Sequence, residues 1–511
     1  MSIRPLLGFL FLIGVTFPLV GGERLGLVIN EDNSHFYTSR PAEEMSLEGL
    51  QAFVDQYADT EVSHLFLSTN SMKTSFASYA REAIWELGDQ APPATANGRR
   101  WVANARKLHE QGLDPYAVWI ARCREVGISP WLSMRMNDVH NVPDVTSYMH
   151  DSFWRENPDL WRIPGDPPDD WTDRALDYHQ PAVREHAMAL VRELLMRYQP
   201  DGLELDWMRF GWHFRPGEEA RGGEVLTEFM REVRALADRW AERRGRPLKI
   251  AVRVPAHPGA ADGLGMPGVR WAQEGLIDML VPCPFWTTSD YDIPLKLWRQ
   301  RLGPAAAQVV LAPGIEYNMR AWPDGKNVPN TLETVRGWAA MAWEQGADQL
   351  YFFNYMDSQT LPFSHDDYRI MLERGFGPAE LARQSRRHPQ TYRDTVPLGA
   401  DAEIKLPAPL TAGAEFALNL GHIPSDATTT LILGLDSEAW GKGEPVVTVN
   451  GVRCPRMADD EDVAPFPGTV RALRFACPGE EVVDGHNVFV VAPFDGADAT
   501  QIVWAEARIE P

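Results

Sequence analysis

Two carboxylates stand one residue apart in the stretch "DGLELDWMRF", where Glu204 and Asp206 alternate with Leu203, Leu205 and Trp207. Side chains alternate between the two faces of a strand, so a strand here would place both acids on one face and the apolar residues on the other. A buried carboxylate costs free energy unless it is paired or used. The pattern therefore predicts two acids that face a shared interior.

The two acids are predicted to have different tasks. Asp206 lies nearer the end of the strand, and Glu204 lies about two strand rises, roughly 6.6 Å, deeper. Arg135 and Arg253 end the strands expected on either side. We expect an arginine clamp to make Glu204 an orienting residue within the catalytic group. Arginine neighbours would also keep Asp206 ionised, which suits a nucleophile, a base or a stabiliser of positive charge.

Cleavage of a glycosidic bond needs a second carboxyl group across the scissile bond. Candidates follow four other strands: Glu31 and Asp32, Asp138, Asp290 and Asp292, and Glu316. We favour Glu316 as the second catalytic acid, because it stands closest to its strand end in "LAPGIEYN" and would face Asp206 across a ring of strands. Asp290 is the alternative, since Phe285, Trp286 and Tyr291 would supply an apolar pocket that raises a carboxyl pKa.

Polar and aromatic residues at other expected strand ends are candidate substrate contacts. They are Arg135, Asn137, Asp138, His140, Arg209, Trp212, Trp286, Asp290, Tyr317, Arg320, Trp322, Asn354 and Tyr355. Arginine and asparagine can bond sugar hydroxyls, and arginine can also grip a planar anion in two places. Either the substrate is an acidic or sulfated sugar, or these arginines only neutralise the carboxylates beside them.

Short apolar runs alternate with helical periodicity from residue 25 to about 355, which is typical of repeated strand and helix units around a parallel sheet. The expected strands are 25–29, 64–68, 128–134, 202–207, 249–254, 279–282, 309–313 and 349–353. Expected helices include 46–58, 181–198, 224–244 and 331–345. Eight such units predict a (β/α)8 TIM barrel, with its active site at the C-terminal ends of the strands. An open doubly wound sheet is the alternative, but no glycine-rich phosphate turn follows the first strand.

Two further segments depart from this repeat. Residues 135–173 are too long for an ordinary connection and are rich in Pro, Asp and Trp, so we expect a wall or lid over the mouth. After about residue 390, alternating strands and turns replace helical periodicity and predict a β-sandwich over residues 391–511. The sequence favours a buttress for the barrel domain, residues 23–390, with carbohydrate binding as the alternative role.

The first 22 residues predict export. Arg4 precedes an apolar run from residue 6 to residue 20 and two glycines, which is the pattern of a signal peptide cleaved near Glu23. The run is shorter than a membrane span needs. We expect a soluble protein in the periplasm or outside the cell. In an oxidising compartment, Cys454 and Cys477 could form one disulfide bridge.

The formal net charge of −22 argues against nucleic acid or an anionic membrane as a partner, since both require a basic face. The 18 tryptophans fit a carbohydrate partner, because flat aromatic faces near strand ends can stack on sugar rings. The predicted partner is therefore a carbohydrate substrate, and the predicted chemistry requires no cofactor.

The stretch at residues 176–210, "LDYHQPAVREHAMALVRELLMRYQPDGLELDWMRF", resembles a segment of the glycosyl-hydrolase-like barrel family, which reads in outline LD-x-x-x-P-x-V-R-E, then Y-x-x-D-G-x-x-x-D. The resemblance implies a glycoside-hydrolase-type barrel in which Asp206 is the closing acid of the motif. "DGLELD" is also similar to the fourth strand of the α-amylase superfamily, where an Asp is the nucleophile, but Glu204 stands where that superfamily has Arg. Family-18 chitinases carry D-x-x-D-x-D-x-E; here Met208 replaces the proton donor, which argues against their mechanism.

The leading hypothesis is an exported glycoside hydrolase that acts through Asp206 and a second acid. The alternative is a carbohydrate-binding barrel without catalysis. A third hypothesis is a metal-dependent hydrolase with His140 among Asp138, Glu204 and Asp206. No histidines stand at metal-ligand spacing such as H-x-H or H-x-x-x-H, so we expect no metal.

Overall fold

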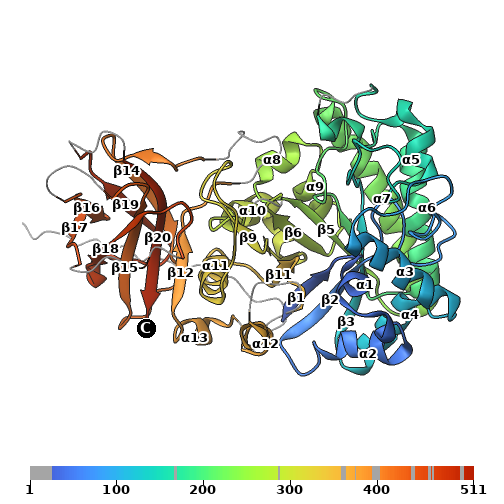
Figure 1. The fold of residues 1–511 in the computed structure, drawn as a ribbon, viewed down its shortest axis with the longest axis horizontal. Coiled ribbons are helices and arrows are strands. Elements are labelled where there is room, and N and C mark those ends of the chain that lie inside the picture. Colours follow the sequence, from blue (N-terminus) through green and yellow to red (C-terminus); the bar gives the residue numbers. More distant parts are fainter. Residues whose placement is uncertain are drawn as a thin grey trace, which may run out of the picture.

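The computed structural model describes residues 26–165, 170–285, 288–357, 364–374, 376–393, 403–438, 444–457, 462, 465–494 and 500–511. The proposed signal peptide and Trp286 lie outside these ranges. Along the long axis of the molecule, a helix-rich part that follows the N-terminus adjoins a part built of antiparallel strands (Figure 1). We call the first part the barrel and the second part the C-terminal sheets.

A curled parallel sheet forms the centre of the barrel, with strand order β7-β6-β5-β4-β3-β2-β1-β11-β8. The strands are β1 Leu27–Glu31, β2 Val62–Ser68, β3 Ser129–Arg135, β4 Gly202–Asp206, β5 Lys249–Pro255, β6 Met279–Cys283, β7 Val310–Leu311, β8 Gly314–Ile315 and β11 Leu350–Phe353. Each of the eight expected strands is present; β7 falls within the expected strand 309–313, and β8 begins just after its expected end. The parallel sheet with helices outside it is consistent with the predicted α/β barrel.

The two edges of this sheet meet on one short stretch of chain. β7 pairs with β6, β8 pairs with β11, and only Ala312 and Pro313 separate β7 from β8. The backbone N–H of Ala312 donates to Leu280 O at 3.0 Å, and that of Tyr351 donates to Pro313 O at 3.0 Å. The C-terminal ends of all these strands therefore gather at one end of the barrel.

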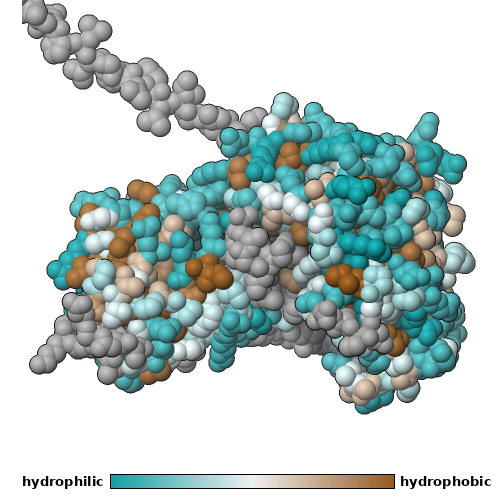
Figure 2. All heavy atoms as spheres, turned by 90° about the horizontal axis from the view of Figure 1, so that it is seen from above, coloured by the Kyte–Doolittle hydropathy of each residue, from teal (hydrophilic) through white to brown (hydrophobic). Residues whose placement is uncertain are grey.

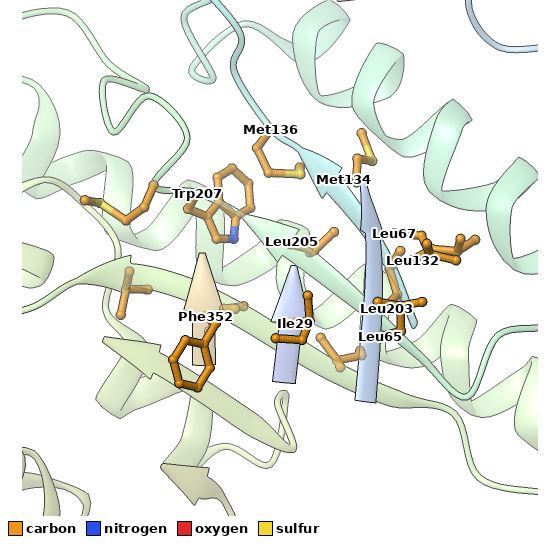
Figure 3. Close-up of a cluster of buried hydrophobic side chains, with 14 of the residues drawn as sticks. Ile29, Leu65, Leu67, Leu132, Met134, Met136, Leu203, Leu205, Trp207 and Phe352 are labelled. Carbon is orange, nitrogen blue, oxygen red and sulfur yellow. The ribbon is translucent and has the colours of Figure 1, made fainter. Parts of the chain in front are cut away.

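Side chains alternate along the strands as predicted. Leu203, Leu205 and Trp207 lie in the apolar layer outside the strands, beside Ile29 and Leu132 (Figure 3). A separate apolar cluster fills the interior of the curled sheet, with Val28, Phe66, Trp131, Ala251, Met279, Val281, Cys283, Ala312, Tyr351 and Phe353. Glu204 and Asp206 face this interior.

Helices connect the strands and cover the outer layer. They are α1 His35–Ser39, α2 Leu47–Asp55, α3 Ala96–Glu110, α4 Pro115–Glu125, α5 Ser152–Glu156, α6 Pro181–Tyr198, α7 Glu219–Arg244, α8 Pro258–Gly263, α9 Gly268–Gln273, α10 Leu295–Leu302, α11 Leu332–Glu344, α12 His365–Glu373 and α13 Pro378–Leu381. Proline at its first position suits the start of α6, and a reciprocal Thr331 and Thr334 cap starts α11. The four expected helices correspond to α2, α6, α7 and α11.

The long segment between β3 and α6 is a packed unit. Trp154 is fully buried, and its indole N–H donates to Arg174 O at 2.8 Å. Arg174 in turn donates to Val142 O at 2.5 Å, which ties the end of the segment to its beginning. This packing holds Trp171, in a 3₁₀ helix over Trp171–Arg174, beside Trp212 of the loop that follows β4.

The C-terminal part contains two antiparallel sheets. One is formed by β12 Arg386–Pro389, β13 Ala408–Pro409, β15 Thr428–Leu435, β18 Arg471–Cys477 and β20 Gln501–Glu510, and the other by β14 Ala414–Asn419, β16 Val447–Val449, β17 Val452–Cys454 and β19 His486–Val491. Both sheets contribute to one hydrophobic cluster, but their arrangement as a sandwich stays a prediction. β12 begins before the expected boundary at residue 390, because it pairs with β20.

A hairpin of the barrel joins this cluster. β9 Asn318–Met319 pairs with β10 Val328–Pro329 in the loop between β8 and α11. Met319 and Ala321 of this loop are buried in the hydrophobic cluster of the C-terminal sheets. The C-terminal sheets therefore pack against the loop that begins at Glu316.

The predicted disulfide bridge is wrong for this structure. Cys454 and Cys477 are buried free thiols that lie close enough to interact with each other. Within the described part of the chain, no helix is both long enough and apolar enough to cross a membrane. On the face seen in Figure 2, hydrophobic residues form small patches scattered among hydrophilic ones.

Candidate active site

Asp206 is held by Arg253 at the C-terminal end of the barrel. The parallel register of β4 and β5 sets these two residues side by side. Arg253 Nε donates to Asp206 Oδ1 at 2.8 Å and Nη2 donates to Oδ2 at 3.0 Å. The backbone N–H of Met208 donates to Oδ1 at 3.1 Å, and the ring of Phe353 lies 3.8 Å from the guanidinium carbon. This bidentate pair fixes both the position and the plane of the carboxylate.

Glu204 lies one level deeper, and its predicted arginine clamp is wrong. Ser133 Oγ and Asn30 Nδ2 donate to Oε2 at 2.5 and 3.2 Å, and Tyr351 OH donates to Oε1 at 2.8 Å. The reason is register: the neighbours of Glu204 on β3 and β5 are Ser133 and Ala251, whereas both arginines stand at the level of Asp206.

Burial and the nearby charge of Asp206 raise the pKa of Glu204 to about 7, although Ser133, Arg253 and Tyr351 oppose the shift. Glu204 is fully buried. At neutral pH a large fraction of the Glu204 side chain is therefore protonated in the folded protein. Its carboxylate oxygens are occupied by Ser133, Asn30 and Tyr351 in the barrel interior.

Arg135 organises a second group of charges at the mouth. It forms ion pairs with Asp32, which follows β1, and with Asp138 at 3.2 Å. Burial alone would raise the pKa of Asp32, but the guanidiniums of Arg135 and Arg209 hold it well below its ordinary value. Burial also opposes the shift at Asp138, where His140 and Arg135 hold the pKa far below its ordinary value. Both carboxylates are therefore charged at neutral pH.

Glu316 follows β8 and is fully buried. Its carbonyl oxygen accepts hydrogen bonds from Ser289 Oγ at 2.6 Å, Asn330 Nδ2 at 2.8 Å and Tyr355 OH at 3.1 Å. Asn354, whose φ is 60°, donates from Nδ2 to Glu316 Oε2 at 3.4 Å. The backbone at Glu316 is thus held by Ser289, Asn330 and Tyr355, which fixes the position from which its side chain extends.

The buried thiol of Cys283 lies within the electrostatic reach of both Glu316 and Asp206. Arg253 Nη1 donates to Cys283 Sγ at 3.5 Å. Burial raises the pKa of the Cys283 thiol to about 12, and the charges of both Glu316 and Asp206 contribute to the rise. A Cβ on Gly314 would lie 2.6 Å from Cys283 Sγ, so glycine is required there. Both favoured acids are therefore close enough for their charges to affect the same buried thiol.

Asn137 holds the loops at the mouth. Its Nδ2 donates to Leu176 O at 2.9 Å and to Trp212 O at 2.7 Å, and its Oδ1 accepts from the N–H of Leu176 at 2.9 Å. Both amide donors are used within the protein, which argues against the predicted substrate contact by the Asn137 side chain. This amide instead ties the segment before α6 to the loop after β4.

Asp290 does not join the cluster at the mouth. Arg393 Nε donates to its Oδ2 at 3.1 Å, in a buried ion pair between the barrel and the chain near the C-terminal sheets. Its neighbour Asp292 is paired with His486 at 2.8 Å. The Asp290 carboxylate therefore lies against the guanidinium of Arg393 and not in the proposed apolar pocket. This ion pair argues against Asp290 as the acid and as a substrate contact.

Other candidates are also used elsewhere. Glu31 faces outward, where His35 Nδ1 lies 2.7 Å from its Oε2 and Tyr57 OH donates to its Oε1. The Tyr355 hydroxyl is buried against Glu316 O, and Trp322 packs against the hydrophobic cluster of the C-terminal sheets. Arg320 donates to Pro323 O at 3.1 Å. Tyr317 is half-buried beside Glu316.

Aromatic rings form a wall beside the mouth. Phe285 lies 5.0 Å from Trp212 and 6.4 Å from Trp171, with the second pair of rings nearly parallel at 14°. Trp171 and Trp212 are partly exposed, so part of each side chain is accessible for contact with a sugar. Trp171 was missed from the sequence, because its 3₁₀ helix is far along the chain from any strand end.

Within the described residues, no group of three or more His, Cys, Asp or Glu side chains is arranged to hold a metal ion. His140 contacts Asp138, with Nδ1 at 2.9 and 3.0 Å from the two carboxylate oxygens. Its Nε2 lies 3.3 Å from Arg209 Nη2. Both ring nitrogens of His140 therefore face protein groups.

No protein-family model and no curated protein matches the sequence. Among solved structures, α-L-fucosidase isoenzyme 2 from Paenibacillus thiaminolyticus is similar at 14% identity and a TM-score of 0.42, over 68% of this chain and 48% of that chain. The chain thus spans about half the length of that fucosidase. The PgaB (BpsB) glycoside hydrolase domain from Bordetella bronchiseptica matches at 12% identity and a TM-score of 0.38, over 70% of this chain and 97% of its own.

The GH36 α-galactosidase AgaB from Geobacillus stearothermophilus matches at 13% identity and a TM-score of 0.35, over 95% of this chain and 55% of that chain. Glycoside hydrolases are thus among the solved structures to which this chain is similar.

Proposed function

We propose that this protein is a glycoside hydrolase that acts at the C-terminal end of the barrel. The observation that carries the proposal is the bidentate contact by which Arg253 fixes the Asp206 carboxylate. Glu316 follows another strand of the same sheet, and the charges of both acids affect the Cys283 thiol. A carboxylate that cannot rotate is suited to attack a sugar or to stabilise the positive charge that develops on it.

In this proposal the two acids divide the work. Asp206 is the nucleophile, the base or the stabiliser of positive charge, and Glu316 is the general acid that protonates the leaving oxygen. Glu204 lies one level deeper than Asp206 and exchanges no proton with substrate, since its carboxylate oxygens accept from Ser133, Asn30 and Tyr351. The half-exposed rings of Trp171 and Trp212 bind a sugar by stacking.

The substrate is a poly- or oligosaccharide, and the chemistry needs no cofactor. We further propose that residues 1–22 export the protein to the periplasm or the cell exterior. In this view the C-terminal sheets form a β-sandwich that buttresses the loop after Glu316, where Met319 enters their hydrophobic cluster. Neither nucleic acid nor a membrane is a partner.

A second candidate is a carbohydrate-binding barrel without catalysis. The specific observation in its favour is burial: Asp206 is 2% exposed and Glu316 is 0% exposed. Both acids would then be structural, and the aromatic wall would hold a glycan at the mouth.

The test compares the wild-type protein with the Asp206→Asn and Glu316→Gln variants on an array of defined polysaccharides. Released reducing ends report hydrolysis, and affinity electrophoresis reports binding. We expect wild-type hydrolysis of at least one glycan, a loss of about a thousandfold or more in both variants, and retained binding.

Asp238→Asn is the matched control, because the Asp238 side chain is 63% exposed on the outer helix α7, where it pairs with Arg234. This variant should hydrolyse the glycan at the wild-type rate. Binding by the wild-type protein without any released ends would favour the carbohydrate-binding barrel, and full activity of Asp206→Asn would refute the assigned nucleophile.

A further inference from the structure

Arg209 differs from the other arginines at the mouth. Arg135 and Arg253 are each in ion pairs with carboxylates. The hydrogen bond of Arg209 joins its Nη2 to Nε2 of His140 at 3.3 Å. Among the residues that the structure describes, no carboxylate lies within ion-pairing distance of the Arg209 guanidinium, and its Nε has no hydrogen-bond partner.

The guanidinium of Arg209 is partly exposed between two aromatic rings. Its Cζ lies 5.7 Å from the centre of the Phe210 ring and 5.6 Å from that of Phe353. Nη1 makes no hydrogen bond to a described residue and is not among the buried unpaired atoms, so it is accessible. Rings on two sides exclude water and strengthen any charge interaction made there.

The charged groups around Arg209 do not neutralise its positive charge. Burial, then Arg135 and Arg253, lower the pKa of Arg209 to about 10, while Asp32 and Asp138 oppose the shift. Arg209 is therefore still a cation at neutral pH.

We infer that Arg209 binds an oxyanion of the substrate, either the carboxylate of a uronic acid or a sulfate ester on a sugar. The inference rests on the proposed function, since the anion would belong to the glycan cleaved beside Asp206. A sugar hydroxyl would accept a hydrogen bond from Nη1 but would leave the guanidinium without a counter-ion. A carboxylate or sulfate supplies both the acceptor and the charge.

The competing explanation is that Arg209 only offsets the charges of Asp32 and Asp138 at longer range. In that case the mouth would have no preference for anionic over neutral sugars. The two explanations thus differ in a binding measurement that requires no catalysis.

The experiment measures binding of sodium glucuronate, glucose 6-sulfate and glucose to the full-length protein by NMR titration. We expect at least one anionic sugar to bind about tenfold or more tightly than glucose at low salt, and 0.5 M NaCl to weaken this preference. Glucuronate and glucose 6-sulfate are separate arms, so the preferred oxyanion is identified by which of them binds.

Three variants assign the preference to its residue. Arg209→Gln should remove the preference for the anionic sugar and leave glucose binding unchanged, and Arg209→Lys should retain part of it because the charge remains. Arg215→Gln is the control, since Arg215 lies in the same loop but pairs with Asp177 at 3.3 Å. It should bind all three sugars like the wild type.

Equal binding of anionic and neutral sugars by the wild-type protein would overturn the inference, as would an undiminished preference in a folded Arg209→Gln variant. The proposed function fails in a different way. If no glycan is hydrolysed while anionic sugars bind through Arg209, only the catalytic proposal falls. If neutral glycans are hydrolysed without any anion preference, only this inference falls.

Discussion

At the scale of single residues, the position of Asp206 depends on Arg253. Two parallel hydrogen bonds, at 2.8 and 3.0 Å, fix a planar group against a planar group. A lysine at the same place keeps the charge but offers only a point donor on a flexible stem. The fork of Arg253 therefore supplies orientation in addition to charge.

Replacing Arg253 with lysine should lower kcat on the hydrolysed glycan about a hundredfold, with KM changed less than about threefold. The reason is that Asp206 stays paired but loses its fixed plane. Steady-state kinetics measure the split, and circular dichroism checks the fold. Arg301→Lys is the control, since Arg301 is half-exposed in a pair with Asp262. An unchanged kcat in Arg253→Lys would show that the plane of Asp206 does not matter.

The raised pKa of Glu204 predicts that the stability of the folded protein depends on pH. Its pKa is about 7 in the folded protein against an ordinary 4.5, so between these values the folded protein holds a proton that the unfolded chain releases. This contribution to stability is present below about pH 4.5 and is lost as the pH rises through 7. The isosteric Glu204→Gln variant lacks this titration.

Relative to the wild type, Glu204→Gln should therefore gain stability between pH 5 and pH 8, by up to about 3 kcal/mol. Ser133 and Tyr351 can turn their hydroxyls to accept from the new amide, so the substitution should be tolerated. Urea unfolding at both pH values measures the difference, with Asp238→Asn as the acid-to-amide control. A difference that stays constant over this range would contradict the raised pKa.

At the scale of elements, periodicity predicted the strands and the long helices well. The strand expected at 202–207 is β4 Gly202–Asp206, and the helix expected at 181–198 is α6 Pro181–Tyr198. Two boundaries could not be predicted, because they depend on partners far along the chain. β12 starts early since it pairs with β20, and β7 separates from β8 since each pairs with a different neighbour.

The site was predicted less completely than the fold. The predicted placement of Asp206 between Arg135 and Arg253 agrees with the strand register, while its catalytic role stays a prediction. The sequence assigned the arginine clamp to Glu204, because register between strands is not visible in spacing along one strand. It also counted Asn137 as a substrate contact. Nothing in the local sequence shows that its amide is used by Leu176 and Trp212, which lie 39 and 75 residues away.

The loops that hold Glu316 depend on Asn330. Its Nδ2 donates to Glu316 O and to Ser289 Oγ, both at 2.8 Å, and its Oδ1 accepts from Tyr291 OH at 2.5 Å. A single buried amide thus joins the loop after β6, the loop after β8 and the start of α11.

Asn330→Ala should lower the free energy of unfolding by about 2–4 kcal/mol, since it leaves several buried polar groups without partners. It should also lower kcat about tenfold, because Glu316 loses part of its support. Urea unfolding and steady-state kinetics measure the two effects. Asn157→Ala, at an exposed asparagine bonded to Phe153 O, is the control. Loss of stability without loss of kcat would show that Asn330 does not support the catalytic role of Glu316.

At the scale of the whole molecule, the barrel and the C-terminal sheets are joined at several places. Met319 of the barrel loop is buried in the hydrophobic cluster of the C-terminal sheets. A Cβ on Gly337 of α11 would lie 2.0 Å from Arg387 O of β12, so that helix and strand are in close contact. We therefore expect the two parts to lose structure together, and not one after the other.

The buried pair of Arg393 and Asp290 tests this coupling. Its side chains are 9% and 5% exposed, and Arg393 Nη2 also donates to Asp292 O at 3.0 Å. Arg393→Met leaves a buried carboxylate without its cation, which should cost about 3–5 kcal/mol of unfolding free energy. Asp290→Asn leaves the guanidinium of Arg393 without its anion and should also lower the free energy of unfolding.

The double variant of Asp290→Asn and Arg393→Met should lose about 1–3 kcal/mol less than the sum of the two single variants, because each single change strands the other group. Urea unfolding followed by tryptophan fluorescence measures all four proteins of this cycle. The half-exposed pair of Arg301 and Asp262 supplies the control cycle, with a coupling below about 1 kcal/mol. Additive losses at Arg393 and Asp290 would mean that this pair does not join the barrel to the C-terminal sheets, and the buttress would then rest on apolar packing around Met319 alone.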